Sequence, residues 1–549
     1  MKSILYPSKV IRALAVLAAA GALSINAHAD CNINMGSTSQ TIDGYGFSTA
    51  WCGQEATAIQ NLMGTGSGQC GFTLLRIRID PNKGWTDETA NAATAHSMGG
   101  KVLGTPWSPP ASMKSNGNVV GGSLLASQYG NYASFLNQAG SSINLDYVSV
   151  QNECDWNPTY EGCVWSGAQM ETFCANNAPA IGRSVVMPEA LGFNDSLSDP
   201  TLNDSTAASH VTIIAGHFYG SGNYVHQNAL NHGKHVWMTE ISRDNVDIGT
   251  CITTAQEISD AMNNQFSAYF WWWNNESQAC ALTSGGSPRK NAYTIGQFAK
   301  FVRPGGVRVS ADHNPASGVS VTSYKVNGNL VIVAINANTG GTSVKFNISN
   351  GSVGTMEGYR TSSGENMSDI GSFGVSSGSF TPTLAAQSIT TFVQTGSGGG
   401  GGGGAPVSGS TYKIVARHSG KALDANGNAT ANGTQIIQWT YGGGSNQKWT
   451  VTDTGSGNWK IIGVQSGRAV DVSNGGTANG TKVQLWDYVA NTAQLYKFAA
   501  TDSGYYRITP NCATGSCLDV SGASTADGAV VQLWQWLNAS NQQWAFQAP

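Results

Sequence analysis

The sequence predicts an α/β protein, in which a (β/α)8 TIM barrel with a β-sandwich side domain is followed by a separate all-β unit. Three observations lead to this fold class. Short apolar runs alternate with helix-compatible segments as far as residue 304, antiparallel-type strands follow, and a threefold repeat begins near residue 410. A chain of 549 residues is long enough for several domains with cores of their own.

The first 29 residues have the pattern of a secretory signal peptide. Three positive charges within residues 2–12 precede an apolar stretch over 13–23, and residues 27–29 give the small-x-small sequence AHA. An uncleaved membrane anchor is the alternative, but the apolar stretch is shorter than the ~20 residues that a bilayer span needs. We therefore expect a secreted, extracellular protein with no membrane partner after cleavage.

Composition narrows the function classes further. Only 11% of the residues are charged and the net charge is −4, so the sequence has no basic footprint for nucleic acid. Ten cysteines fit export, and their spacings resemble no zinc site, so we expect disulfides, no metal and no cofactor. The candidate disulfides are Cys52–Cys70, Cys251–Cys280 and Cys512–Cys517.

Eight short apolar runs in the predicted barrel domain, residues 30–304, have the character of strands buried on both faces. They span 42–47, 72–79, 101–106, 146–152, 184–188, 211–217, 234–239 and 267–273. Helix-compatible segments, such as 86–98, 128–139 and 252–264, lie between most of them. Eight strand–helix units close into a barrel, whose active site lies at the carboxyl ends of its strands.

Residues 305–395 have a different pattern. The segment SVTSYKVNGNLVIVAINAN alternates and contains an Asn327-Gly328 turn, as antiparallel strands do. It predicts the β-sandwich side domain, and the segment before residue 42 is a candidate to join it. Residues 396–409, GSGGGGGGGAPVSG, predict a flexible linker because glycine loses the most backbone entropy on ordering.

Residues 410–549 contain three copies of one pattern. In each copy an Asp precedes a Trp by 15 residues and a Gln-x-Trp or Gln-x-Tyr follows, with a period of 47 to 48 residues. One copy is too short to bury a core alone, so the three must share one. In this register the motifs resemble the ricin-type β-trefoil, carbohydrate-binding module family 13, which implies a sugar-binding domain.

This resemblance implies a sugar site in each repeat that has the Asp, the Trp and an Asn-Gln pair. The second repeat has Ala493 where the Asn should be. We expect Trp449, Tyr496 and Trp544 to form the shared core instead. The predicted sugar-binding residues are Asp424, Trp439, Asn446, Gln447, Asp519, Trp534, Asn541 and Gln542.

Two carboxylates end apolar strands of the predicted barrel. DYVSVQ runs into Asn152-Glu153, and KHVWMT runs into Glu240. A lone Glu at such a place is most simply a solvated strand end, but two at matching ends form the pair that glycoside hydrolysis needs. In a retaining hydrolase the two carboxyl groups lie ~5–5.5 Å apart.

Aromatic residues gather at the same strand ends. Sugars present flat C–H faces that stack on rings, so aromatics at a barrel mouth favour a carbohydrate substrate. Because alternate residues of a strand face opposite ways, we expect Trp237 or Trp271 to belong to the core. The candidates for stacking are Trp107, Tyr219, Trp272 and Trp273.

The motifs IDGYG, LRIRID, TPWSPPASMKSNG, VSVQNE, GHFYG, VWMTE and QFAKFVRPG resemble glycoside hydrolase family 30, and within it the bacterial xylanases. The match runs along nearly all of residues 30–395. It implies a retaining endo-β-1,4-xylanase with Glu153 as acid/base and Glu240 as nucleophile. Asn152 matches the Asn that holds the sugar 2-hydroxyl group beside the nucleophile.

One stretch departs from the glucuronoxylanases of that family, which carry an Arg after the strand-eight tryptophans that grips a glucuronate carboxylate. Glu276 takes the matching position here, and Ser242 stands where a Tyr is expected. We therefore expect no strict requirement for glucuronate side groups. Arg243 is the nearby cation that could substitute.

Several functions stay open at this stage. The first is a secreted endo-xylanase, with a glucuronoxylan-specific enzyme or another family 30 activity (β-1,6-glucanase, galactanase or glucosylceramidase-like) as alternatives. A different class is a catalytically inactive, lectin-like binding protein, against which the presence of both carboxylates argues. The expected partner is a polysaccharide, xylan for the first function, and the chain is expected to be a monomer.

Overall fold

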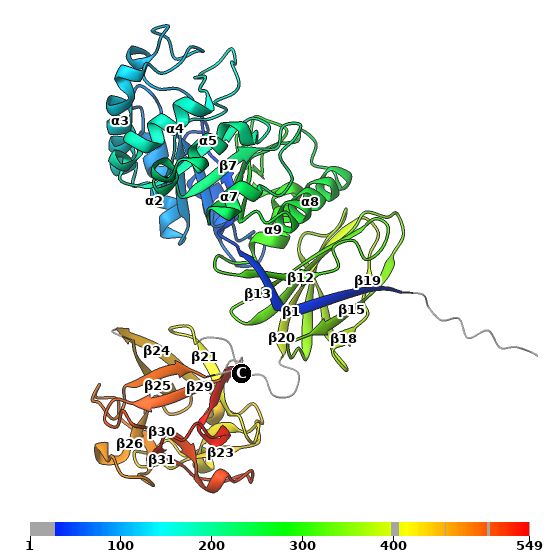
Figure 1. Cartoon of the computed structure of the whole chain (residues 1–549). Coiled ribbons are helices and arrows are strands. Elements are labelled where there is room, and N and C mark those ends of the chain that lie inside the picture. The colour runs from blue at the N-terminus through cyan, green and yellow to red at the C-terminus, as the bar shows by residue number, and fades with distance from the viewer. Residues whose placement is uncertain (1–27, 397–405, 456, 502–504, 548) are drawn as a thin grey trace, which may run out of the picture.

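The computed structural model describes residues 28–396, 406–455, 457–501, 505–547 and 549 (Figure 1). All but the last two residues of the predicted signal peptide, and most of the predicted linker, lie outside these ranges. The described chain forms a barrel, a side domain built on a β-sheet, and a C-terminal all-β domain. Within the described ranges, no helix is long and apolar enough to cross a membrane.

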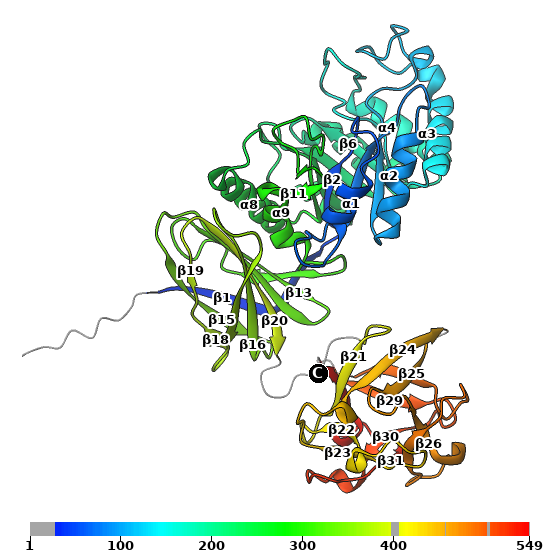
Figure 2. The ribbon, with the colours of Figure 1, turned by 180° about the vertical axis from the view of Figure 1, so that it is seen from behind.

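Eight parallel strands close into the barrel, which confirms the predicted fold class. Each strand overlaps one of the eight predicted runs; they are β2 (Gly44–Ser48), β3 (Leu74–Arg78), β4 (Lys101–Thr105), β5 (Tyr147–Ser149), β6 (Ser184–Ala190), β7 (Ile213–His217), β8 (His235–Glu240) and β9 (Ala268–Trp271). The surrounding helices (Figure 2) are α1 (Ala56–Met63), α2 (Thr86–Ser97), α3 (Tyr129–Ile143), α4 (Gly167–Asn176), α5 (Asp199–Asn203), α6 (Ser205–Ser209), α7 (Gln227–Asn231), α8 (Ile248–Asn263) and α9 (Lys290–Ala299). A short hairpin of β10 (Thr283–Ser284) and β11 (Ser287–Pro288) lies between β9 and α9.

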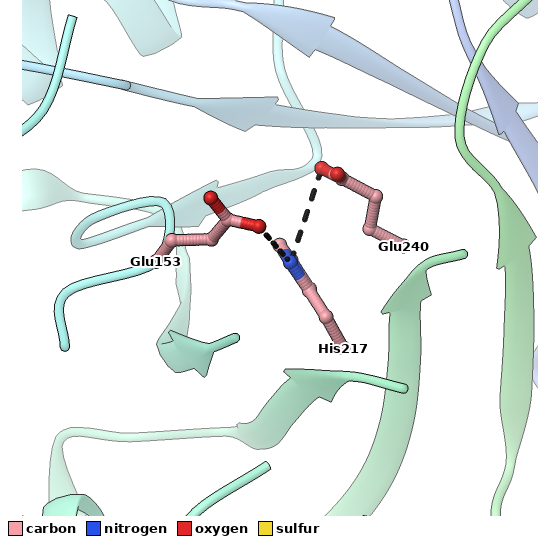
Figure 3. Close-up of side chains that lie close together, drawn as sticks. All are labelled: Glu153, His217 and Glu240. Atoms are coloured by element: carbon pink, nitrogen blue, oxygen red, sulfur yellow. Dashed lines mark hydrogen bonds and ion pairs between the residues drawn. The ribbon is translucent and has the colours of Figure 1, made fainter. Parts of the chain in front are cut away.

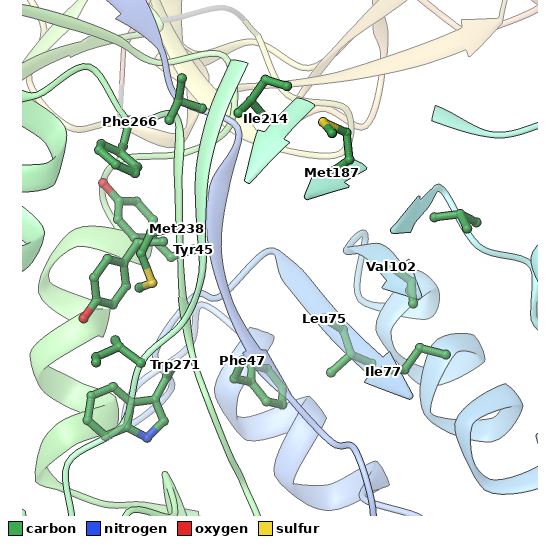
Figure 4. Close-up of a cluster of buried hydrophobic side chains, with 14 of the residues drawn as sticks. Tyr45, Phe47, Leu75, Ile77, Val102, Met187, Ile214, Met238, Phe266 and Trp271 are labelled. Carbon is green, nitrogen blue, oxygen red and sulfur yellow. The ribbon is translucent and has the colours of Figure 1, made fainter. Parts of the chain in front are cut away.

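Alternate residues of the barrel strands face opposite sides of the barrel wall. Leu74 and Phe270 belong to a small cluster inside the barrel together with Trp237. Leu75 and Trp271 belong instead to the large cluster between strands and helices (Figure 4). Both Trp237 and Trp271 are therefore core residues, where the sequence predicted one of the two.

The side domain is built on a ten-stranded sheet that includes the N-terminal strand. β1 (Ala29–Thr41) pairs antiparallel with β12 (Val307–Ala311) and parallel with β15 (Thr342–Ser349). The remaining strands are β13 (Val319–Val326), β14 (Asn329–Asn336), β16 (Thr355–Thr361), β17 (Ser368–Gly374), β18 (Ser379–Phe380), β19 (Thr383–Leu384) and β20 (Ser388–Gly396). Asn327 and Gly328 join β13 to β14 with φ of 50° and 84°, as a type I′ hairpin turn requires.

The C-terminal domain buries one core shared by its three repeats. Its strands are β21 (Thr411–Ala416), β22 (Ala422–Ala425), β23 (Ile436–Trp439), β24 (Trp449–Gly455), β25 (Asn458–Gly463), β26 (Ala469–Val472), β27 (Val483–Trp486), β28 (Tyr496–Ala500), β29 (Tyr506–Pro510), β30 (Ser516–Val520), β31 (Val531–Gln535) and β32 (Trp544–Gln547). Trp449, Tyr496 and Trp544 are fully buried in that core. Each donates its ring N–H or hydroxyl group to a backbone carbonyl, so the predicted core is confirmed.

The three predicted disulfides, Cys52–Cys70, Cys251–Cys280 and Cys512–Cys517, are not formed, and all ten cysteines are free thiols. The fold gives the thiols other neighbours than the sequence spacing suggested. The sulfur atoms of Cys52, Cys251 and Cys517 face the carbonyls of Ala50, Val246 and Trp534 at 3.6, 3.7 and 3.7 Å. Each therefore lies against backbone from its own vicinity or from the adjacent strand rather than against its predicted partner.

Candidate active site

The two predicted catalytic carboxylates meet at the carboxyl end of the barrel. Glu240 is the last residue of β8, Glu153 lies just beyond β5, and each residue is 5% exposed. One oxygen of each carboxylate and one ring nitrogen of His217 all lie within 4.8 Å of one another (Figure 3). This short distance favours a retaining pair, whose carboxyl groups lie ~5–5.5 Å apart, over an inverting pair, whose carboxyl groups lie ~6.5–9.5 Å apart.

The main chain around Glu153 is held in a strained turn. Its φ is 44°, in the left-handed region that residues with a side chain seldom adopt. The N–H group of Glu153 donates to the carbonyl of Glu189 at 2.8 Å, and that of Asn152 donates to the carbonyl of Pro106 at 2.9 Å. The ends of the neighbouring strands thus fix the turn, as expected where backbone strain serves a functional site.

Arg76, to which the sequence analysis assigned no role although it lies in the motif LRIRID, anchors Glu240. It lies two residues beyond the inward-facing Leu74 on β3, so the period of the strand directs it into the barrel mouth. Its guanidinium group donates to Oε2 of Glu240 and to Oδ1 of Asn152, both at 2.6 Å. This planar fork fixes both side chains and turns the amide N–H₂ group of Asn152 away from the arginine.

His217 lies between the two carboxylates on the same inward-facing side of β7. Its Nδ1 is 3.2 Å from Oε1 of Glu153 and 4.0 Å from Oε2 of Glu240 (Figure 3). Burial lowers the pKa of His217, but the attraction of Glu240, Glu153 and Glu189 outweighs burial and raises the pKa to about 9. The imidazole is therefore a cation at neutral pH, and it places a positive charge between the two carboxylates.

Two tyrosines complete the hydrogen bonding of the carboxylates. Tyr219 donates its hydroxyl group to Oε1 of Glu240 at 3.1 Å, and Tyr160 donates to Oε2 of Glu153 at 3.2 Å. Burial raises the pKa of the Glu240 carboxyl, although His217 and Arg76 attract its ionised form. The ionised nucleophile therefore depends on both cations.

A cleft of about 680 Å³ opens over the carboxylate pair. It is lined by Trp51, Trp107, Glu153, Trp156, Tyr160, Leu191, Tyr219, Glu240, Ser242, Trp272, Trp273 and Asn275. Four tryptophans form one wall: the ring centroids of Trp51 and Trp107 are 4.8 Å apart, those of Trp107 and Trp272 5.5 Å, and Trp273 stacks on Trp272 at 5.4 Å. A wall of rings beside convergent polar groups is suited to a row of sugar units.

The structure brings the predicted barrel residues together. Trp107, Tyr219, Trp272 and Trp273 line the cleft, and Asn152 lies beside it on Arg76. The sequence analysis missed Trp51, Trp156 and Tyr160, which come from the loops after β2 and β5. Only their aromatic character could have signalled them, because loop residues have no period that fixes their direction.

The loop after β9 does not place Glu276 in the cleft. Its carboxylate accepts the hydroxyl group of Thr283 at 2.6 Å and the N–H groups of Gly285 and Gly286 at 2.7 and 2.8 Å, so it braces the β10–β11 hairpin. Arg243, the predicted substitute cation, is ion-paired with Glu257 at 2.6 Å. Among the described residues, no Lys or Arg lines the cleft.

The first trefoil repeat has a hollow where the sugar site was predicted. Asp424, Trp439, Asn446 and Gln447 line a space of about 390 Å³, and Trp439 is 45% exposed. Nδ2 of Asn446 donates to Oδ2 of Asp424 at 2.9 Å. Gln447 binds the backbone of Thr440 and Gly442, so it also braces the hairpin that carries Trp439.

The third repeat preserves this arrangement, and the second does not. Asn541 donates to Oδ2 of Asp519 at 2.8 Å, and Gln542 braces the hairpin after Trp534. In the second repeat, the buried Ala493 replaces the Asn, and the Asp471 carboxylate accepts from Gln484 at 3.1 Å. The Asp–Asn contact is therefore present in the first and third repeats and absent from the second.

Comparison with known proteins supports both domains. Residues 403–486 and 492–548 match the family model of the ricin-type beta-trefoil lectin domain-like proteins. The chain is 34% identical over 405 residues to glucuronoxylanase XynC of Bacillus subtilis (strain 168), which covers 69% of this chain and 95% of that protein.

Two solved structures match the same region. The glycoside hydrolase family 30 subfamily 8 xylanase Xyn30A from Clostridium acetobutylicum is 39% identical, with a TM-score of 0.64. The match covers 66% of this chain and 99% of the xylanase chain. A GH30 endoxylanase from Clostridium papyrosolvens C71 is 38% identical with a TM-score of 0.62 and the same coverage. The similarity therefore spans essentially the whole length of these relatives.

Proposed function

Because the chain belongs to glycoside hydrolase family 30, we propose that it is a secreted, retaining endo-β-1,4-xylanase that binds its substrate through a ricin-type domain. The observation that carries the proposal is the buried pair Glu153 and Glu240 within 4.8 Å, under a cleft walled by tryptophans. The inactive, lectin-like alternative gains no support, because both carboxylates keep their partners.

The reaction proceeds in two displacements. In the first, a carboxylate oxygen of Glu240 bonds to the anomeric carbon, the glycosidic C–O bond breaks, and the leaving oxygen takes the proton of Glu153. In the second, water loses a proton to Glu153 and attacks the same carbon, and the bond to Glu240 breaks. Both carboxyl groups return to their starting states, and the two inversions retain the configuration.

The surrounding groups prepare each displacement. Arg76 and the His217 cation stabilise the ionised form of Glu240, which burial alone would disfavour. The amide of Asn152, oriented by Arg76, is placed to hold the sugar 2-hydroxyl group. The tryptophan wall holds adjacent sugar rings, so that substrate binding is spread along the cleft.

We further propose that the enzyme does not require glucuronate side groups. A carboxylate on the substrate is held best by a guanidinium fork. Arg76 and Arg78, which lie against cleft tryptophans, and Arg243, which follows the cleft residue Ser242, are each already ion-paired with protein carboxylates. A glucuronoxylan-specific enzyme is the second candidate, favoured by the activity of the Bacillus relative.

The experiment that tests this function is product analysis on three substrates: linear xylooligosaccharides, arabinoxylan and glucuronoxylan. The proposal expects internal cleavage of the linear chains, with kcat/KM within about tenfold of that for matched branched chains. A preference of a hundredfold or more for the branch, about 2.7 kcal/mol, would favour the glucuronoxylan-specific enzyme.

The trefoil domain is proposed to bind xylan through its first and third repeats. In these repeats the Asp–Asn contact leaves hydrogen-bonding groups beside a Trp, as a sugar ring requires. The N-terminal pattern and the sugar-binding domain support an extracellular location, and we propose that the enzyme acts there as a monomer on insoluble plant cell-wall polysaccharide.

A further inference from the structure

A third carboxylate, Glu189, lies beneath the catalytic pair and has no place in the mechanism above. It is fully buried and does not line the cleft, so it does not touch the substrate. A buried carboxylate is costly unless it is paired and hydrogen-bonded, so its position needs an explanation.

The strand that carries Glu189 is distorted to aim it inward. β6 shows a register shift against β7 between Pro188 and Ala190, and Glu189 has φ of 49°. A bulge of this kind redirects a side chain, and bulges are common beside active sites. Without the bulge, the alternation of side chains along β6 would direct the residue next to Glu189, rather than Glu189 itself, toward the barrel interior.

The Glu189 carboxylate contacts the groups that hold the catalytic pair. Its Oε1 is 3.1 Å from Nε of Arg76 and 3.9 Å from Nε2 of His217. Its Oε2 accepts the hydroxyl group of Thr105 at 3.0 Å. Arg76 and His217 thus each lie between Glu189 on one side and a catalytic carboxylate on the other.

The main chain of Glu189 supports the same site. Its carbonyl accepts the N–H group of Glu153, and the N–H group of the next-but-one residue, Leu191, donates to the carboxylate of Asp155 at 2.9 Å. The end of β6 therefore positions the turn that carries the acid/base, in addition to the two cations.

The charges of the network balance only if Glu189 is counted. Arg76 and His217 supply two positive charges, whereas Glu240 is the one catalytic carboxylate that must be ionised. Burial raises the pKa of Glu189, but Arg76 and His217 outweigh it and hold the pKa at about 2, so Glu189 stays ionised wherever the enzyme works.

We propose that Glu189 is a positioning residue of the reaction, which holds Arg76 and His217 against the catalytic pair and offsets one of their two charges. The inference rests on the proposed hydrolase function. Glu189 acts through other side chains, so a variant of Glu189 is expected to change the pH profile as well as the rate.

Two variants separate charge from geometry. Glu189→Gln keeps the shape and removes the charge, so Arg76 and His217 are less compensated. Glu240 is then easier to ionise, and His217, which also faces Glu153 and Glu240, loses its proton at lower pH. The acidic limb of the kcat/KM profile, which follows the ionisation of Glu240, is expected to move to lower pH by about one unit, with a lower kcat.

Glu189→Asp keeps the charge and withdraws it by one methylene group. We expect both limbs to stay in place while kcat falls by about 100-fold, because a misplacement of about 1 Å costs that much. The matched control is Asp146→Asn, which removes a carboxylate bound to Lys101 at 2.7 Å and His96 at 2.9 Å beside the amino end of β5. It should leave kcat and both limbs unchanged.

The wild-type enzyme is first assayed on linear xylooligosaccharides, and absence of hydrolysis there would refute the proposed function rather than this inference. Given an active wild type, an unmoved acidic limb in a folded Glu189→Gln variant would overturn the role of Glu189. So would a wild-type kcat in Glu189→Asp, which decides the matter if the Gln variant does not fold. A shift of equal size in Asp146→Asn would also overturn it.

Discussion

The barrel cleft and the trefoil hollows use the same residue types, carboxylate, amide and tryptophan, in two different ways. In the cleft, the carboxylates are joined by Arg76 and His217 into one charged network drawn from several strands. In the hollows, Asp424 and Asp519 pair with amides, and burial raises the pKa of each. The network belongs to one site in the barrel, whereas the Asp–Asn contact recurs in the first and third repeats.

This difference separates catalysis from binding. A chemical step needs ionised and protonated groups held at a fixed distance, so each member of the network depends on the others. Sugar binding needs only hydrogen bonds and a ring face, and copies can substitute for one another. Changes in the cleft should therefore abolish activity, whereas changes in one hollow should only weaken attachment.

The largest effect is expected from Glu240→Ala and Glu240→Gln. Removing the nucleophile should lower kcat by roughly 10⁴-fold or more on soluble xylan, with binding to insoluble xylan unchanged. Azide should restore part of the activity of the Ala variant and give a glycosyl azide of inverted configuration. Wild-type turnover in either variant, measured as reducing sugar released, would contradict the assignment.

Arg76→Lys should have the next largest effect. It keeps the positive charge but cannot bind Glu240, Asn152 and Glu189 together, so kcat/KM should fall by about 100-fold. Arg243→Lys is the matched control, because that arginine pairs with Glu257 outside the cleft lining. Equal losses in the two variants would mean that the fork geometry is unimportant.

The first and third repeats can be tested against the second. Asp424→Ala together with Asp519→Ala should weaken retention on insoluble xylan by about 10- to 100-fold, because two linked sites are lost. Asp471→Ala should have little effect, since its repeat lacks the Asn. Pull-down isotherms of the three proteins check this, and an effect of Asp471→Ala as large as that of the double variant would refute the division.

The acidic limb of the pH profile tests the network in the wild type. Protonated Glu240 cannot attack, so activity is present above its pKa and is lost as the pH falls through it. Because burial raises the pKa of Glu240, the limb of kcat/KM should have its midpoint above the ordinary value of 4.5. A midpoint below that value would mean that the cations outweigh burial.

The smallest effect should come from deleting residues 396–549. Hydrolysis of soluble xylan should stay within about twofold, because the trefoil acts by local concentration rather than within the cleft. Action on insoluble xylan should fall. An equal loss on soluble substrate would show that the two domains are coupled.

The sequence allowed the fold and the shared trefoil core to be predicted because each has a period, and it brought out the carboxylate pair because both residues follow apolar strands. Strand alternation and strand ends located Glu153 and Glu240, and the repeat located Trp449. Arg76 and His217 lie within the motifs LRIRID and GHFYG, but the sequence analysis assigned them no role, because their function depends on which strands become neighbours. Glu189 lies at a bulge, where the period itself is interrupted.

The loops and cysteines were the least predictable parts. Glu276 was placed by its distance from Trp273, but hydrogen bonds to the β10–β11 hairpin turn it away from the cleft. The cysteine spacings gave pairs that the chain does not form, because a spacing along the sequence says nothing about the direction in which each thiol points.

The central claim, that one buried carboxylate pair performs a double displacement, is tested most directly by the anomer that is formed first. Proton NMR during the first minutes of xylooligosaccharide hydrolysis should show the β-anomer of the new reducing end, followed by slow mutarotation to the equilibrium mixture. If the α-anomer forms first, water attacks directly, and Glu240 is not a nucleophile that becomes covalently bonded.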